Sequence, residues 1–493
     1  MPLSARDDKD IFKEGLRKRL SFIFNDDALR GMNLGAVVYS LSRQEDLFKL
    51  NAETGLSPAS TVKMLTAFVA LKRLGPDFRF ETDLYRDGQI RGSTLEGNLY
   101  LVGGGDPHLV SERMYLLVNQ LKRTGISRVT GQIFVDDSAF DEIRVDEARI
   151  PTKTDRAYNA PVSALSFNYN TTTVFYQPGD KEGEKPTVYI EPDTGYVKLT
   201  NKSKTTRRTS RNRMIASRHT DKEGDLVVMQ GSIPRGYPEQ RSFFNITKPS
   251  IYAGKALQYF MAKEGIQVVK PLIQKKEKPK TAQKLLTFKS LPLRDIVTLM
   301  NKYSNNFIAD TLVKTMGMKF KGAPGTMAKG LEVINEEATR IGINYGPYKV
   351  VSGSGLTRKN SVSAKQFVEL LNAAYLDFEV LPEMLASLPI AGKDGTLEKR
   401  MKQTAAFGQL RAKTGTIDGV SALTGVVQSK GGEMLAFAVL MNDPQKRSGR
   451  NMKRWENYFG QALASFNRKT ELDEQPEPIH DVMGGGGSSH GTR

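Results

Sequence analysis

Residues 76–288 have a pattern unlike that of the chain on either side. Short alternating strands separated by turn residues fill this block, whereas helical patterns dominate the flanking segments. A chain of 493 residues is also longer than one ordinary domain. We therefore predict an α/β (α+β) domain built from both chain ends, residues 10–75 and 289–468, with strand-rich domains inserted between them.

The insertion is predicted to have two parts, residues 76–165 and 166–288. Within it, residues 202–218 are rich in Lys and Arg with no acidic residue, which is typical of a solvated loop. Residues 469–493 include a run of Gly and Ser and are predicted to be a flexible tail.

Composition excludes several kinds of chemistry. There is no cysteine, so disulfides, thiolate catalysis and Cys-ligated metals are excluded. Of the four histidines only His108 and His219 lie outside the tail, so a Ser-His-Asp triad would have to use one of them. The net charge of +18 suits nucleic acid, anionic wall polymers or membrane surfaces equally well.

A polar pair stands out in the predicted helix over residues 60–74, whose apolar residues nearly encircle the axis. Ser60 and Lys63 are three residues apart and so share one face of this helix. A buried lysine has a lowered pKa and becomes able to accept a proton from a serine hydroxyl near neutral pH. An isolated Ser-x-x-Lys is more often a helix cap with a surface lysine.

Two further elements follow this pair along the chain. Ser304 and Asn306 lie at a break between two predicted helices, where both side chains can face one cleft; alone, they would be read as helix caps. Lys413, Thr414 and Gly415 lie on a predicted edge strand, where an acyl substrate could add as an extra strand and Lys413 attract its carboxylate. Together, the three elements predict an acyl-transfer site.

This combination resembles the penicillin-binding proteins, in which Ser-x-x-Lys, Ser-x-Asn and Lys-Thr-Gly occur together. More closely, the chain is similar to the class C low-molecular-mass group, the type-4 D-alanyl-D-alanine carboxypeptidase/endopeptidases of serine peptidase family S13. The long gap between Lys63 and Ser304 is also typical of that group. The stretches that carry the resemblance include residues 103–107, 136–140, 353–358 and 392–397.

The resemblance implies a serine β-lactamase/transpeptidase-like fold and a role for each matching residue. Ser60 would attack the carbonyl of the penultimate D-Ala, Lys63 would be the general base, and Ser304 would relay a proton. Asn306 would position Lys63, and Lys413 would hold the substrate carboxylate. The backbone N–H groups of Ser60 and Thr416, next to Thr414 and Gly415, would form the oxyanion hole.

Asp155 and Arg358 fit the family's way of binding the amine and carboxylate of a diaminopimelate side chain. Both could equally be structural. Ser352 stands where the family often has Asp before Gly-Ser-Gly; if that Asp supports Arg358, its absence would loosen side-chain selectivity.

The expected partners are peptidoglycan stem peptides, their cross-links and β-lactam antibiotics. Peripheral contact with an anionic wall or membrane surface is a further hypothesis. No metal, organic cofactor or nucleic acid is expected. By resemblance the protein acts in the periplasm or cell-wall space, exported by a signal peptide absent from this numbering.

Three other functions stay open at this stage. A β-lactamase would need a further carboxylate to activate the deacylating water, and no segment clearly supplies one. A wall-binding sensor would be acylated without releasing product. A nucleic-acid-binding protein would use residues 202–218, although no aromatic residue interleaves that run.

Overall fold

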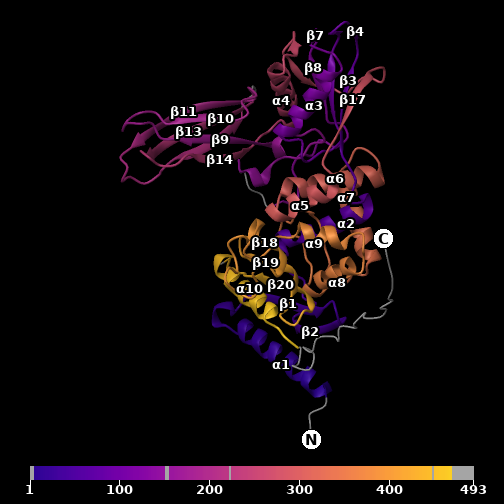
Figure 1. Ribbon diagram of the computed structural model, residues 1–493, viewed down its shortest axis with the longest axis vertical. Coiled ribbons are helices and arrows are strands. Elements are labelled where there is room, and N and C mark those ends of the chain that lie inside the picture. The colour runs from indigo at the N-terminus through magenta and orange to yellow at the C-terminus, as the bar shows by residue number, and fades with distance from the viewer. Residues whose placement is uncertain (1–4, 150–154, 221–223, 447–448, 469–493) are drawn as a thin grey trace, which may run out of the picture.

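The computed structural model describes residues 5–149, 155–220, 224–446 and 449–468 (Figure 1). The predicted tail, residues 469–493, lies outside this part of the chain. The described residues form three regions: a helix-and-sheet region made by both chain ends, an inserted region, and a group of long strands that projects from it (Figure 1).

The first region is built on an antiparallel sheet of order β18-β19-β20-β1-β2. Its strands come from the two ends of the chain: β1 (Asn33–Ser40), β2 (Glu45–Leu50), β18 (Leu410–Ile417), β19 (Val420–Gln428) and β20 (Met434–Asn442). Alternate residues of β19 face opposite sides of the sheet, and each side carries its own apolar core. A sheet buried on both faces explains why β19 reads as a nearly continuous apolar strand.

Helices cover both faces of this sheet. On one face, α1 (Ala5–Phe24) packs against α10 (Gly449–Ala464), so helices from the first and last parts of the chain lie side by side (Figure 1). The other face is covered by a helical layer, formed by α2 (Lys63–Leu74), α5 (Leu293–Tyr303), α6 (Asn306–Lys321), α7 (Met327–Arg340), α8 (Ala364–Tyr375) and α9 (Leu381–Ser387). The helix α2 lies inside this layer, and its residues from Lys63 to Leu71 are all buried.

The inserted region contains two sheets of mixed parallel and antiparallel pairing, with orders β16-β8-β6-β3-β17 and β15-β7-β5-β4. Its helices are α3 (Ser111–Arg123) and α4 (Pro249–Lys263). Its strands are β3 (Glu81–Arg86), β4 (Gln89–Arg91), β5 (Thr94–Glu96), β6 (Leu99–Gly103), β7 (Arg128–Val129), β8 (Ile133–Asp136), β15 (Gln267–Val268), β16 (Ile273–Lys275) and β17 (Gln283–Lys289).

The projecting strands form two three-stranded sheets, of order β10-β9-β14 and β11-β13-β12. They are β9 (Thr171–Gln177), β10 (Thr187–Ile190), β11 (Val197–Thr206), β12 (Ile215–Thr220), β13 (Asp225–Pro234) and β14 (Gln240–Asn245). Much of the basic stretch 202–218 therefore belongs to paired strands, β11 and β12, rather than to the loop that we predicted.

Strand pairing does not follow the division expected near residue 165. The strands β15, β16 and β17 come from the second predicted part, yet they pair with β7, β8 and β3 of the first. These strands return to the first sheets because α4 packs against β8 and carries the chain back across them.

Candidate active site

Ser60 and Lys63 lie where the short turn η2 (Ala59–Val62) continues into α2. Ala59 has a left-handed backbone, with φ of +47°. The loop at Gly355 approaches it so closely that a Cβ on Gly355 would lie 2.0 Å from the Ala59 carbonyl oxygen. A tightly packed, strained turn therefore presents Ser60.

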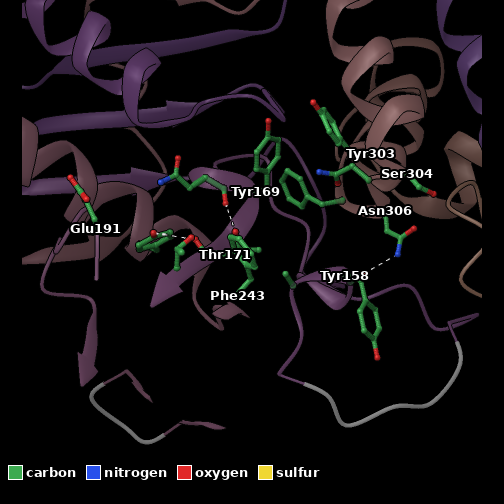
Figure 2. A pocket seen from close by; sticks show the side chains of 14 residues that line it. Tyr158, Tyr169, Thr171, Glu191, Phe243, Tyr303, Ser304 and Asn306 are labelled. Carbon is green, nitrogen blue, oxygen red and sulfur yellow. Dashed lines mark hydrogen bonds between the residues drawn. The ribbon is translucent and has the colours of Figure 1, made fainter. Parts of the chain in front are cut away.

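The Lys63 amine is fully buried and has three oxygen partners. It lies 2.9 Å from Ser60 Oγ and 2.7 Å from Asn306 Oδ1, and it donates a short hydrogen bond to the carbonyl of Ser354. The amide of Asn306 is held in this orientation because its Nδ2 donates to the Tyr158 carbonyl, at 3.0 Å (Figure 2).

This set of partners determines what a neutral Lys63 can do. The Asn306 oxygen and the Ser354 carbonyl can only accept, so they use the two N–H groups of a neutral amine. The lone pair is then left for the Ser60 hydroxyl, which becomes the donor. When Lys63 loses a proton, its lone pair is therefore directed at the Ser60 hydroxyl and can accept the hydroxyl proton.

The second group of side chains joins Ser304 to Lys413. The helix α5 ends at Tyr303 and is followed by Ser304, which has a left-handed backbone with φ of +54°. Asn305 caps the start of α6. Lys413 on β18 is also fully buried, and its Nζ donates to Ser304 Oγ and to the Thr414 carbonyl, both at 2.8 Å.

Burial controls the charge on both lysines. It lowers the pKa of Lys63 to about 7, against a raising effect of Asp310 and a smaller lowering effect of Arg149. Burial also lowers the pKa of Lys413 well below the usual value, and the charge of Lys63 adds to this. Among the described residues the partners of both lysines are hydroxyl, amide and carbonyl oxygens and no carboxylate, so nothing in direct contact restores the charge of either.

Strand β18 lies against the nucleophile turn. A Cβ added to Gly415 would lie 2.6 Å from the Pro58 carbonyl oxygen and 3.2 Å from the Ser60 nitrogen. Glycine is required here for the strand to approach Ser60. The predicted Thr416 follows on the same strand, at the edge of the sheet.

The structure does not bring Arg358 and Asp155 into this cluster of hydrogen bonds. Arg358 donates to the backbone carbonyl of Asp418, in the turn after β18, and lies 3.5 Å from the carboxylate of Asp418. Asp155 accepts from the backbone N–H of Arg218 at 3.0 Å, on β12. Ser352 is buried with its hydroxyl 3.2 Å from that of Ser354, rather than bonded to Arg358.

Two backbone carbonyls are parts of the site that we did not predict, those of Ser354 and Tyr158. Ser354 lies in residues 353–358, one of the stretches that carried the family resemblance, but a carbonyl leaves no mark of its own in a sequence. The two candidate histidines lie elsewhere: His108 faces Tyr169, and His219 lies 3.1 Å from Ser217.

A cavity of about 430 Å³ adjoins the break between α5 and α6. Figure 2 shows Ser304 and Asn306 on one side of it and Tyr169, Phe243 and Glu191 of the inserted and projecting regions on the other. Neither Ser60 nor Lys413 lines it.

Within the described ranges there is no group of three or more acidic or histidine side chains placed to hold a metal ion. No described helix has both the length and the apolar character needed to cross a membrane.

The family model of the D-Ala-D-Ala carboxypeptidase 3 (S13) family matches residues 16–459. This chain belongs to that family. A D-alanyl-D-alanine carboxypeptidase of Actinomadura sp. is 33% identical over 441 residues, which are 87% of this chain and 81% of the relative. A carboxypeptidase of Haemophilus influenzae is 26% identical over 84% of this chain and 86% of its own length.

Solved structures agree with the family assignment. The crystal structure of penicillin binding protein 4 from Haemophilus influenzae superposes with a TM-score of 0.76 at 25% identity, covering 90% of this chain and 98% of that one. A predatory peptidoglycan endopeptidase from Bdellovibrio bacteriovorus shares the fold, with a TM-score of 0.51 at 18% identity, over 88% of this chain and 93% of that one. The predicted S13 membership, the α/β (α+β) fold class and the serine-type D-Ala-D-Ala peptidase class are confirmed.

Proposed function

We propose that the protein is a serine D-alanyl-D-alanine carboxypeptidase and endopeptidase in which Ser60 forms the acyl-enzyme. The observation that supports this most directly is the arrangement at Lys63, where two obligate acceptors direct the lone pair of the neutral amine to the Ser60 hydroxyl. With its pKa near 7, Lys63 is substantially neutral at physiological pH.

Acylation then proceeds in two proton transfers. Lys63 takes the proton of Ser60 as Oγ attacks the carbonyl carbon of the penultimate D-Ala, forming a tetrahedral intermediate. The C–N bond breaks as the leaving amine receives a proton through Ser304, whose hydroxyl is hydrogen-bonded to Lys413. Water hydrolyses the ester and returns Ser60.

Lys413 and the strand that carries it would bind the substrate. The edge strand β18 offers its backbone for strand addition along Thr414 and Gly415, with Lys413 attracting the terminal carboxylate. The N–H groups of Ser60 and Thr416 would stabilise the oxyanion. Arg358, which contacts Asp418 in the turn after β18, and Asp155 are proposed to bind the side chain of the stem peptide.

β-lactams are proposed to acylate Ser60 by the same attack. A structure of the Haemophilus influenzae protein contains a β-lactam. Because the leaving amine of an opened β-lactam stays attached to the acyl group, it cannot diffuse away, and hydrolysis is slow.

The test is the mass of the intact protein after incubation with benzylpenicillin. We expect one penicilloyl adduct on the wild type and on Ser57→Ala, a control three residues away, and none on Ser60→Ala. An adduct on Ser60→Ala, or none on folded wild type, would contradict the assignment. Release of D-Ala from pentapeptide separates a peptidase from a sensor that is only acylated.

A β-lactamase is the competing enzyme. In the described part of the chain no carboxylate is hydrogen-bonded to Ser60 or Lys63, which favours slow deacylation. Rapid turnover of nitrocefin would favour a β-lactamase over a peptidase.

We further propose that the protein acts in the cell-wall space. Its net charge of +18 would hold it against anionic wall or membrane surfaces. Binding to isolated sacculi should weaken as salt is added, and salt-independent binding would contradict the electrostatic part of this proposal.

A further inference from the structure

A buried ion pair joins the inserted region to α6 behind the catalytic residues. Arg149 Nη2 lies 2.5 Å from Asp310 Oδ2, and the two side chains are only 2% and 1% exposed. Asp310 lies one turn after Asn306 on α6. Burying a charged pair is costly, and such pairs often contribute little net stability, so its position next to the site calls for another explanation.

The pair closes a ring of contacts around Asn306, whose oxygen accepts a hydrogen bond from the Lys63 amine. Arg149 Nη1 donates to Asn159 Oδ1 at 2.9 Å and to the Ala160 carbonyl at 3.3 Å. These residues follow Tyr158, whose carbonyl orients the Asn306 amide. Arg149 therefore holds, from the inserted region, the segment that fixes the Asn306 oxygen toward Lys63.

The pair also acts on Lys63 through its charges. Asp310 raises the pKa of Lys63 and Arg149 lowers it, so their effects oppose each other. Other charged groups near this cluster are Lys413, on the side of β18, and Asp146, which interacts with both members of the pair. Lys314, on the next turn of α6, interacts with Asp310.

We propose that Arg149 and Asp310 are a charge-balanced pair of positioning residues, through which the inserted region holds Asn306 in place and keeps Lys63 able to act as a base. This inference rests on the proposed function. It assigns the inserted region a part in the reaction itself, besides any part in binding substrate.

The test is the pH dependence of acylation by benzylpenicillin, followed by intact mass. In the wild type the rate should rise through the pKa of Lys63. Arg149→Met leaves Asp310 uncompensated and should move the midpoint upward, whereas Asp310→Asn should move it downward. A displacement of about half a unit corresponds to roughly a threefold change in rate below the midpoint. The double variant should return toward the wild-type midpoint.

Arg149→Lys separates charge from position. It keeps the charge but lacks the forked group that contacts both Asp310 and the segment at Asn159. We expect its midpoint to lie near that of the wild type and its maximal rate to be reduced.

Lys314→Met is the matched control. Lys314 is buried on the same helix, one turn beyond Asp310, and pairs with Asp141 of the inserted region. Lys314→Met should lower the stability of the fold without moving the midpoint of the pH dependence. If the role of Arg149 were purely structural, Arg149→Met would behave in the same way.

Unmoved midpoints in Arg149→Met and Asp310→Asn, or movement of both in one direction, would overturn the inference. If Arg149→Met does not fold, Asp310→Asn decides alone: a lowered midpoint supports the inference and an unchanged one overturns it. Failure of the proposed function is distinguishable, because the wild type itself would then carry no adduct on Ser60.

Discussion

Lys63 and Lys413 are buried side chains without a carboxylate in contact, among the residues the structure describes. A lysine in such a position destabilises the fold whenever it must carry its charge, because burial removes the water that solvates an ammonium. At Lys63, which lies 2.9 Å from the Ser60 hydroxyl, burial favours chemistry that needs a neutral amine. The three-residue spacing of Ser60 and Lys63 indicated the pair from the sequence, whereas the acceptors that orient the amine come from distant segments and could not be predicted.

The first prediction concerns the stability of the fold and its dependence on pH. The pKa of Lys63 is about 7 in the folded protein and about 10.4 in an unfolded chain, so between these values the unfolded state binds the additional proton. The free energy of unfolding must then rise with pH. From pH 7 to pH 9 the wild type should gain roughly 2 kcal/mol relative to Lys63→Met, measured by urea denaturation.

Exposed Lys430→Met is the control for this measurement, and its difference from the wild type should not change with pH. A Lys63→Met difference that also stays constant from pH 7 to pH 9 would mean that Lys63 remains charged in the folded protein.

Two local features of the helices and strands bring Ser60, Ser304 and Lys413 together. The left-handed residue Ser304 separates α5 from α6, and Gly415 lets β18 approach the turn that carries Ser60. The existence of both helices flanking Ser304 and of the strand of Lys413 was predicted, because apolar periodicity and punctuating residues mark them. The packing of β18 against η2 has no such local signal.

Gly415→Ala should disable the site with a limited effect on the fold. The added methyl group would meet the Pro58 carbonyl oxygen, so β18 must move away from Ser60. Misplacement of reacting groups by about 1 Å costs on the order of a hundredfold in rate, and we expect a similar loss in acylation by benzylpenicillin.

The same substitution at Gly15 is the control for crowding at Gly415. Gly15 is an exposed residue of α1 with no other atom within 4 Å of an added Cβ. Gly15→Ala should retain wild-type acylation and gain about 0.5–1 kcal/mol of stability. Acylation of Gly415→Ala at the wild-type rate would show that the close approach is not needed.

The whole molecule depends on its chain ends, which build one sheet and the cores on both sides of it. Arg468, at the end of the described chain, is buried against Glu433 after β19 and also pairs with Glu45 on β2. The two-ended domain was predictable from the separation of the motifs. The return of β15–β17 to the first inserted sheets was not, since such pairing is decided by tertiary contacts over long sequence separations.

Arg468→Met should therefore weaken the contacts that hold the last described residues of the chain against β2 and the turn after β19. Removing Arg468 takes the nearest cation from buried Glu433, which keeps Arg43 at 3.4 Å, while Glu45 keeps Lys13. Because these partners compensate part of the remaining charge, we expect a loss of about 2 kcal/mol in the free energy of unfolding. Acylation at 25 °C should be unchanged, because Arg468 is hydrogen-bonded to none of the catalytic residues.

An exposed ion pair provides the comparison for Arg468. Arg30 and Asp27 form one at 2.6 Å with both side chains more than 80% exposed, and Arg30→Met should cost less than about 1 kcal/mol. Equal effects of the two substitutions would refute the structural importance of the Arg468 cluster.

The sheet made from both ends also sets the order in which the enzyme becomes active during synthesis. The segment with Ser60 is made long before Lys413 and the strands β19 and β20. Until those strands join β1, the nascent chain holds a nucleophile with neither its second lysine nor its edge strand. A chain that is terminated before β18 should therefore be inert toward peptide and antibiotic alike, which confines hydrolytic activity to chains in which β18 to β20 have been made.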